Sequence, residues 1–416
     1  MNPVEADLDH FDPAVRRRAL EHLAATESFP PPTDWHNLHA HTFFSYNAYG
    51  YSPSHFAYLA RKRGLGLAGI VDFDVLDGVE EFHEAGRLLQ LKTVASIESR
   101  VFVPELADRV INSPGEPGIA YHMGVGFVRA LEHPLLTRMR RTAEQRNRDL
   151  LARVNTFTAP VTLDYDRDVL PLTPRGNATE RHICVAYAAR GSREFWRAKL
   201  GDCPEDPAAL QALIRAKTMK QGGVGYVRPG PDTFPAMAEM NQFVREAGAI
   251  PTMTWLDGTS PGERDLNALF DVAIHHGAAA LNIIPDRNYR PGVRDEKLQN
   301  LYDVVATAEK HGFPIIVGTE MNAPGNKFVD DFNTNELKPL VPVFLKGAFI
   351  VYAHTQLQRH TGQGYLSDWA RKQFSTVHEK NAFFERLGRI LPPNATAEDT
   401  RRAVQQLLAQ TSSAHT

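Results

Sequence analysis

Cysteine is almost absent from this chain, which contains only Cys184 and Cys203 among its 416 residues. Two cysteines cannot build a disulfide framework, nor can they form a cysteine-rich zinc or iron–sulfur site. If the chain binds a metal ion, the ligands are therefore imidazoles and carboxylates. The 17 histidines of the sequence make such a site feasible.

Long apolar runs and an excess of charge of one sign are also missing. No stretch is apolar for long enough to span a bilayer, and residues 1–26 lack the apolar centre of a signal peptide. With 46 basic and 49 acidic residues, the formal net charge is -3, which points to neither nucleic acid nor a membrane as partner. We expect a globular cytoplasmic protein that acts on a small molecule, and the sequence carries no signal for its oligomeric state.

The chain instead contains a repeated alternation of helix-like and strand-like segments. It follows an N-terminal helix for which Asp12 is the natural cap. Besides the segment that carries His39 and His41, strands are expected at 65–72, 92–97, 121–124, 250–254, 278–284, 314–317 and 348–351. This pattern predicts parallel strands covered by helices, and seven or eight such units predict a closed or nearly closed barrel. A doubly wound open sheet is the alternative.

The alternation is interrupted by a helical region. Residues 137–155 form a long arginine-rich pattern of helical type, followed by short helices and polar connections. Such a helix is usually a solvated face, and an edge that faces phosphate is the less common alternative. The predicted organisation is an N-terminal helical appendage, a barrel in two segments, a helical insertion and a C-terminal helical extension. Their ranges are 1–28, 34–130 with 223–365, 131–222, and 366–416.

Polar residues recur where the expected strands end. Side chains alternate along a strand with period two, so His39 and His41 can reach one common ion, although an isolated pair is as often two solvent-facing histidines. Other expected strand ends carry Asp72, Asp74, Glu98, His122, Asp257, Glu320 and His354. Because sites in parallel α/β folds form at the carboxyl ends of the strands, this recurrence predicts a polar site at one end of the barrel.

The order of these motifs resembles the PHP (polymerase and histidinol phosphatase) family of metal-dependent phosphoesterases. The similar region extends over about residues 34–322 and includes His-Ala-His-Thr at 39–42, Asp-Phe-Asp at 72–74, Glu98, His-Met-Gly at 122–124 and Arg-His-Ile at 181–183. The resemblance implies a distorted (β/α)7 TIM-like barrel with a helical insertion. It also implies up to three divalent ions at the carboxyl ends of the strands.

Several positions depart from the family pattern. Tyr46, Phe73 and Asn322 stand where the family holds one ion, and an aromatic ring cannot replace an imidazole lone pair, so we expect that ion to be missing. At a second ion site, Trp255 stands in place of one histidine ligand. This site would keep His122 and share Glu98 with its neighbour, and it would bind the ion weakly unless Asp257 compensates. The ligands of the third ion are kept: His39, His41, Glu98 and Glu320. This set suits one Zn²⁺, Mn²⁺ or Fe²⁺ ion, with a second ion as the alternative.

The resemblance also implies roles for nearby residues. Asp72 or His122 would act as general base or orient a water molecule, and His182 would donate a proton or contact an anion. His182 has an equally good interpretation as a capping or core histidine. Arg181, Trp255 and Asn322 would contact substrate, and Trp255 with Tyr46 would suit a sugar or an aromatic ring. Outside the region of resemblance, His354 and His360 would complete the rim of the site, although such residues are more often surface histidines.

The sequence therefore predicts a metal-dependent hydrolase of PHP type that acts on a small phosphorylated or otherwise anionic substrate. Two alternatives remain, a catalytically inactive barrel with a ligand-binding or regulatory role, and a metal-dependent lyase or isomerase. Retention of Glu320 together with both histidines and Glu98 favours an enzyme, because an inactive site would have no need for the full ligand set.

Overall fold

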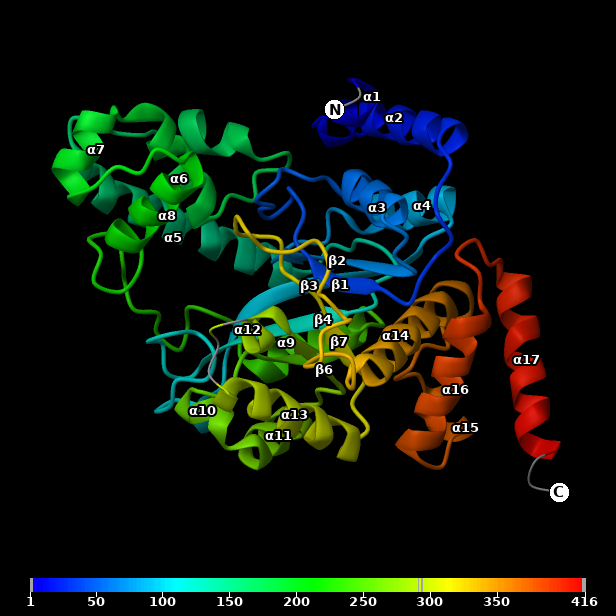
Figure 1. Cartoon of the computed structure of the whole chain (residues 1–416). Coiled ribbons are helices and arrows are strands. Elements are labelled where there is room, and N and C mark those ends of the chain that lie inside the picture. Colours follow the sequence, from blue (N-terminus) through cyan, green and yellow to red (C-terminus); the bar gives the residue numbers. More distant parts are fainter. Residues whose placement is uncertain (1–2, 291, 293–294, 414–416) are drawn as a thin grey trace.

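The computed structural model describes residues 3–290, 292 and 295–413, and within them seven strands form one sheet in sequential order (Figure 1). The strands are β1 (His36–Ala40), β2 (Leu67–Phe73), β3 (Lys92–Phe102), β4 (Ile119–Val125), β5 (Ile250–Trp255), β6 (Ala280–Ile283) and β7 (Ile315–Val317). Glu320, just after β7, forms a parallel bridge with Ala40 of β1. The sheet is thus a nearly closed TIM-like barrel, as predicted.

Helices surround this barrel. Around the strands lie α3 (Pro53–Lys62), α4 (Val79–Leu89), α9 (Met237–Glu246), α11 (Leu266–His275) and α13 (Asp295–Lys310). The N-terminal helix α2 (Pro13–Thr26) packs outside this layer on α3 and α4 (Figure 1). The short helices are α1 (Pro3–Ala6), α10 (Pro261–Arg264) and α12 (Asp286–Tyr289). The predicted cap of α2 is confirmed, because the Asp12 side chain accepts a hydrogen bond from the Ala14 amide.

The expectation of uniformly parallel strands is wrong at β4. This strand pairs antiparallel with both β3 and β5, whereas the other neighbouring pairs are parallel. Between β3 and β4 the chain forms only the short helix Pro104–Leu106 and turns, so no crossover helix carries it back to the start of the barrel. The apolar pattern of a strand does not encode its direction.

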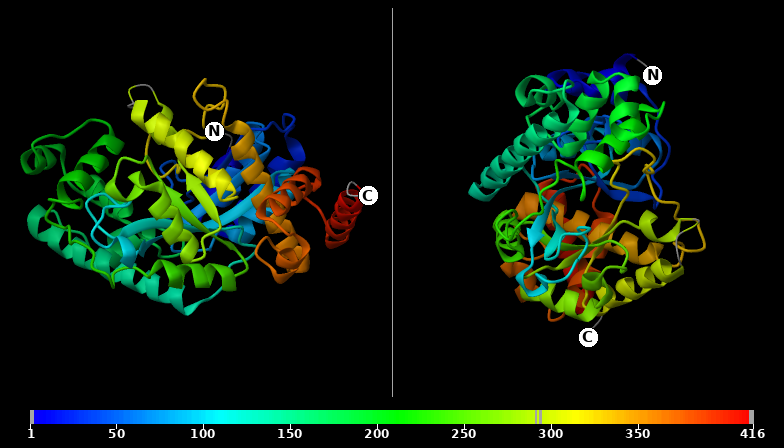
Figure 2. Two further views of the ribbon diagram at one scale, coloured as in Figure 1. Left: turned by 90° about the horizontal axis from the view of Figure 1, so that it is seen from below. Right: turned by 90° about the vertical axis from the view of Figure 1, so that its left-hand side faces the viewer.

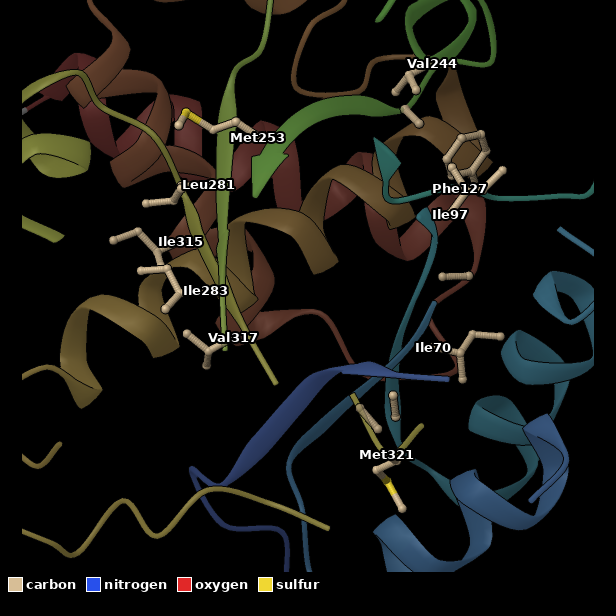
Figure 3. Packing of buried hydrophobic residues seen from close by; sticks show 14 of the residues in the cluster. Ile70, Ile97, Phe127, Val244, Met253, Leu281, Ile283, Ile315, Val317 and Met321 are labelled. Carbon is tan, nitrogen blue, oxygen red and sulfur yellow. The ribbon is translucent and has the colours of Figure 1, made fainter. Parts of the chain in front are cut away.

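Side chains of the strands alternate between two faces. One set, with Ile70, Ile97 and Leu281, joins the core that is shared with the surrounding helices. Figure 3 shows part of this core, with Met253, Leu281, Ile283, Ile315 and Val317 along β5, β6 and β7. The other set packs with α14 (Val341–Thr361) and includes Val71, Val94, Met123, Ile250 and Ile316. We call these the helix-covered face and the enclosed face.

The strand predicted at 348–351 is wrong, since these residues lie inside α14. Residues 347–357 of this helix are all buried. A helix that is buried on all sides shows no apolar stripe, and a short apolar run taken from it cannot be told from a strand.

The helical insertion and the C-terminal helices lie on opposite sides of the barrel (Figures 1 and 2). The predicted range 131–222 contains α5 (Pro134–Thr158), α6 (Glu180–Arg190), α7 (Arg193–Leu200) and α8 (Pro207–Thr218), which share a hydrophobic cluster around Ile183, Tyr187 and Trp196. After α14 follow α15 (Asp368–Gln373), α16 (Val377–Ile390) and α17 (Ala397–Ser413). Residues 1–2 of the predicted appendage and 414–416 of the predicted extension lie outside the described residues. Among the described helices, none combines the length and apolarity needed to cross a bilayer.

Candidate metal centre

Three of the predicted ligands come together inside the barrel. His39 on β1, His41 directly after it and Glu98 on β3 are all buried, and one donor atom from each lies within 4.8 Å of the others. The Nε2 atoms of His41 and His39 lie 3.2 Å and 3.8 Å from Oε2 of Glu98. This group has the composition of a divalent metal site.

An irregularity in β1 places both histidines on the same face as Glu98. Asn37 pairs with Ala68 and Ala40 pairs with Ile70, so β1 contains one residue more than β2 over this stretch. After this irregularity the side chain of Ala40 packs in the core on the helix-covered face. Its neighbours His39 and His41 therefore point to the enclosed face, because side chains alternate along a strand. Glu98 belongs to the enclosed face because its register partner on β4 is Met123.

Hydrogen bonds fix the orientation of both imidazole rings. Nδ1 of His39 lies 3.0 Å from Oδ1 of Asn282, and Nδ1 of His41 lies 3.0 Å from Oγ of Ser45. Ser45 donates its hydroxyl proton to Asp72 at 2.6 Å, so it can only accept from His41, whose Nδ1 therefore carries the proton. The lone pair of His41 is then on Nε2. Metal-bound histidines are oriented by outer partners in this way.

The two Nε2 atoms are buried and have no hydrogen-bond partner among the described residues. Burying a polar atom without a partner costs free energy, so such an atom calls for an explanation. Burial lowers the pKa of His41 to about 4 and lowers the pKa of His39 as well, which keeps both rings in the neutral, metal-binding form near neutral pH. Burial also raises the pKa of Glu98 to about 7, a shift that a bound cation would reverse.

Glu320 lies beside this group, at the point where the barrel closes. Its backbone amide donates to the carbonyl of His39, and its carbonyl accepts from the amide of His41, both at 2.8 Å. Its carboxylate accepts from Arg287 at 2.9 Å and from Asn322 at 3.1 Å. Burial alone would raise the pKa of Glu320, but the Arg287 guanidinium and His39 hold it at about 2. Glu320 is therefore ionised and can serve as a further donor.

The backbone at Glu320 has φ +65°, and at Met321 it has φ +55°. Residues other than glycine rarely adopt this left-handed conformation, which is often found at functional sites. Here it turns the chain directly after β7 and leaves the Glu320 carboxylate where its charge acts on His39 and His41.

Aromatic rings occupy the side of the site where the resemblance implies another ion. The ring of Phe73 stacks on that of His41, with centroids 4.4 Å apart, and the ring of Tyr46 packs edge-on against His182 at 5.1 Å. Neither ring offers an imidazole lone pair.

Asp72 supports the site from the helix-covered side. Its carboxylate accepts hydrogen bonds from the Thr42 amide at 2.9 Å, the Thr42 hydroxyl at 2.7 Å and the Ser45 hydroxyl. By accepting the Ser45 hydroxyl proton, Asp72 keeps the Ser45 oxygen available as acceptor for Nδ1 of His41. This arrangement fits a positioning residue better than the predicted general base.

The structure does not bring His122 and Trp255 to the cluster. His122 is paired with Ser99, next to Glu98, and therefore points to the opposite face, where its Nε2 contacts Oδ1 of Asn241 on α9 at 2.5 Å. Trp255 is fully buried in the helix-covered core. His122 was expected at the site on the assumption that β4 runs parallel to its neighbours, whereas Trp255 lies at the carboxyl end of β5 as expected but on the helix-covered face.

Three further predicted residues also lie elsewhere. Asp257, suggested as a compensating ligand, is paired with Lys297 at 2.6 Å. His354 is buried within α14, where its Nδ1 accepts from the Tyr365 amide, and His360 is a half-buried residue of the same helix. Neither histidine belongs to a strand end, since the strand expected there is a helix.

The insertion contributes Arg181 and His182 to the edge of the site. Nδ1 of His182 accepts from the Thr179 amide in a capping box at the start of α6, which confirms the capping interpretation. The Arg181 guanidinium lies 5.7 Å from the centroid of the Tyr46 ring, and its charge acts on both His41 and Glu320.

Three residues near the site were not predicted from the sequence: Ser45, Asn282 and Arg287. Asn282 follows the same rule as the residues that were found, a polar side chain at the carboxyl end of a buried strand, and this rule would have identified it. Ser45 and Arg287 lie in a turn and in the short helix α12, and no motif distinguishes them from surface residues.

Comparisons with known proteins show what this fold is similar to. No family model matches the sequence, and no curated protein matches it. An amidohydrolase from Chromobacterium violaceum, solved with bound sulfate and no metal, superposes with a TM-score of 0.52 at 15% identity, over 74% of this chain and 96% of that one. A protein from Bifidobacterium adolescentis described as a metal-dependent phosphoesterase superposes with a TM-score of 0.52 at 19% identity, over 76% and 98%. The chain thus shares its fold with two proteins described as hydrolases.

Proposed function

We propose that this protein is a metal-dependent hydrolase of PHP type that acts on a small phosphorylated or otherwise anionic substrate. The observation that carries the proposal is the convergence of the bare Nε2 atoms of His39 and His41 on the Glu98 carboxylate. Each ring is fixed from behind through Nδ1, which is the arrangement that a metal ligand requires.

His39, His41 and Glu98 would hold one divalent ion, with Glu320 as the fourth donor and Zn²⁺, Mn²⁺ or Fe²⁺ as the candidates. When bound, such an ion makes a water molecule more acidic and polarises the bond under attack. Two nitrogen and two oxygen donors match this chemistry.

The residues around the site would bind and orient the substrate. Arg287 donates to Glu320, yet its side chain is 42% exposed, so it retains N–H groups for an anion. Arg181 supplies a second guanidinium from the insertion. Burial lowers the pKa of His182 to about 4, so near neutral pH this residue would act as a neutral hydrogen-bonding group.

The second candidate is a catalytically inactive ligand-binding or regulatory protein. The stacking of Phe73 on His41 favours it, because this ring fills space beside the ligands that the resemblance assigns to another ion. A lyase or isomerase would use the same ligands.

Metal content and turnover test the proposal together. The purified protein is loaded with Zn²⁺ or Mn²⁺, freed of excess and analysed for metal, alongside the variants His41→Ala and Glu98→Gln and the control His22→Ala on the exposed side of α2. We expect one ion per chain in the native protein and the control, and loss of the ion in both site variants. A native protein without metal, or a His41→Ala variant with undiminished metal, would refute the site.

The same proteins are then assayed on phosphomonoesters and phosphodiesters with added Mn²⁺. Turnover that disappears in His41→Ala but persists in His22→Ala supports the hydrolase. Metal binding without turnover supports the binding protein.

A further inference from the structure

A cavity of about 940 Å³ lies between the barrel and the insertion. Its walls come from α5, α6 and α8 on one side and from β3 and β4 on the other. It extends to Arg287, the residue that also contacts Glu320 at the metal centre. This volume is in the upper part of the range of small-molecule sites, about 300–1,000 Å³, and far exceeds what one phosphate or carboxylate needs.

The cavity carries an excess of positive charge. Among the described residues that line it, seven are basic and four are acidic. Glu180 is shared by Arg215 at 3.1 Å and Lys220 at 2.8 Å, and Glu116 is paired with Arg100 at 2.9 Å. Burial alone would raise the pKa of Glu180, but Lys220 and Arg215 hold it at about 2. The cations thus outnumber the carboxylates available to neutralise them.

Arg146 on α5 is one of the lining cations that have no counter-ion in contact among the described residues. Its guanidinium carbon lies 5.1 Å from the centroid of the Phe234 ring, and that of Arg100 lies 4.2 Å from the same centroid. Within the described part of the chain, the Arg146 side chain makes no hydrogen bond or ion pair. Burial lowers the pKa of Arg146 and the nearby positive charge of Arg100 lowers it further, while the charges of Asp74, Glu180 and Glu116 oppose this shift. Arg100 and Arg146 both act on the nearby Asp74, yet the two like charges still repel each other, and an anion bound between them would relieve this repulsion.

Tyr121 lies between the cavity and the metal centre. It lines the cavity and belongs to β4, and burial raises the pKa of its hydroxyl, while Arg100 of the cavity and Glu98 of the metal centre act on it in opposite directions. A ligand that reaches from Arg100 to the metal centre would therefore pass along this ring.

We propose that the cavity binds a second anionic group of the substrate, a phosphate or carboxylate held by Arg100 and Arg146, while the reacting group lies beyond Arg287 at the metal centre. The substrate class is thus an elongated small molecule with an anionic group at each end. The position of the reacting group rests on the proposed hydrolase function. The anion site itself rests only on the cavity and its cations.

Binding of an anionic dye to the metal-free protein tests the anion site separately from catalysis. The probe is pyranine, an aromatic trisulfonate, titrated at low salt and followed by fluorescence anisotropy. The variant is Arg146→Gln, and its matched control is Arg141→Gln, an exposed arginine of the same helix that does not line the cavity. Thermal unfolding of each variant checks that it is folded.

We expect the native protein and Arg141→Gln to bind pyranine equally, and Arg146→Gln to bind at least about tenfold more weakly because a charge-assisted contact is lost. Arg146→Lys, which keeps the charge, should recover part of the affinity. Competition by inorganic phosphate and by citrate then distinguishes a phosphate site from a carboxylate site. Absence of binding by the native protein, or equal weakening in Arg141→Gln, would overturn the proposal. Failure of metal binding would leave this result unchanged and would affect only the hydrolase function.

Discussion

The orientation of His41 depends on a chain of hydrogen bonds through Ser45 to Asp72. In the variant Ser45→Ala, Nδ1 of His41 loses its acceptor and the ring loses its fixed tautomer. We expect the metal affinity to fall about tenfold to a hundredfold, as is typical when an outer partner of a metal ligand is removed. Competition with a fluorescent chelator measures this change, with Ser375→Ala at an exposed position as the control. Unchanged affinity in Ser45→Ala would show that the chain of hydrogen bonds does not act on the metal.

Asp330 is a buried carboxyl group whose protonation links stability to pH. Burial and the neighbouring Asp286 raise the pKa of Asp330 to about 8, although Lys327 opposes the shift. An unfolded chain releases this proton above about pH 4, while the folded chain keeps it, so stability falls as pH rises from about 4 to about 8. This one group contributes a slope of up to about 1.4 kcal/mol per pH unit.

The variant Asp330→Asn carries a neutral side chain at every pH and should lose that part of the slope. Urea unfolding at about pH 5.5, 6.5 and 7.5 compares the two proteins, and the native protein should lose stability relative to the variant as pH rises. Parallel pH profiles would contradict the assignment, because all other titrating groups are common to both proteins.

Residues of the metal centre differ in how far the sequence determines them. His39, His41 and Glu98 could be predicted because each lies at or next to the end of an expected strand and the three bring complementary ligand chemistry, although β3 continues beyond Glu98 to Phe102. His122 occupies a similar place in the sequence, but its strand runs in the opposite direction and its side chain points to α9. Strand direction is set by contacts distant in sequence, so local patterns could not reveal it.

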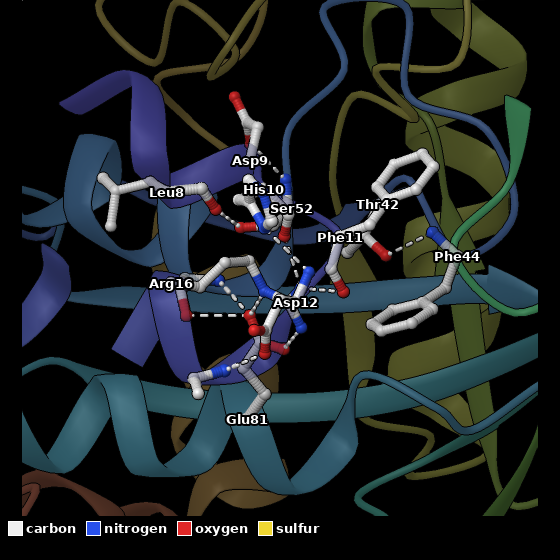
Figure 4. Close-up of polar contacts among 12 residues, drawn as sticks. Leu8, Asp9, His10, Phe11, Asp12, Arg16, Thr42, Phe44, Ser52 and Glu81 are labelled. Carbon is white, nitrogen blue, oxygen red and sulfur yellow. Dashed lines mark hydrogen bonds and ion pairs between the residues drawn. The ribbon is translucent and has the colours of Figure 1, made fainter. Parts of the chain in front are cut away.

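At the scale of elements, the N-terminal helix α2 is fixed to α4 by a buried ion pair. Arg16, whose side chain is 3% exposed, contacts Glu81 through both Nε and Nη2, with the Nε contact at 2.9 Å. Its remaining N–H groups donate to the carbonyls of His10 and Phe11 (Figure 4). The same figure shows Ser52, the N-cap residue of α3. Its amide donates a hydrogen bond to the Asp9 carboxylate and its hydroxyl donates to the Leu8 carbonyl, both in the N-terminal appendage.

Removing one partner of a buried ion pair leaves an uncompensated charge. We therefore expect Arg16→Ala to lower the free energy of unfolding by about 3 kcal/mol or more. Arg17→Ala, which removes an exposed pair with Glu21 on the same helix, should leave the free energy of unfolding nearly unchanged, because solvent screens an exposed pair. Urea unfolding monitored by circular dichroism measures both, and equal losses would mean that Arg16 behaves as a surface residue.

Elements with an amphipathic pattern could be located from the sequence: α2 begins after the expected cap Asp12, and α5 lies close to the expected range 137–155. α14 could not, because its central residues are buried on every side and carry no periodicity. Burial of a whole helix is a property of its neighbours, which a local pattern does not contain.

For the whole molecule, the decisive contact is the one that closes the barrel. β1 and the segment after β7 meet through backbone hydrogen bonds between Glu320 and both His39 and His41. The proposed ligands of one ion thus come from both sides of this junction. A bound ion adds a connection between the first and last strands of the barrel.

Metal binding should therefore raise the thermal stability of the protein. An ion that binds only the folded chain adds about 2.7 kcal/mol when its free concentration is a hundredfold above its Kd. We expect Tm to rise with added Mn²⁺ or Zn²⁺ in the native protein and to stay constant in His41→Ala. Differential scanning calorimetry with a chelator as reference measures this, and an equal rise in both proteins would show that the ion binds elsewhere.

The closure of the barrel at Glu320 also bears on aggregation. A closed barrel has no free sheet edges, whereas a barrel that opens between β1 and β7 exposes two rows of unpaired backbone groups, which are templates for pairing with other chains. A higher concentration of metal ion should then slow the aggregation of this protein on heating, because a bound ion holds the two edge strands together.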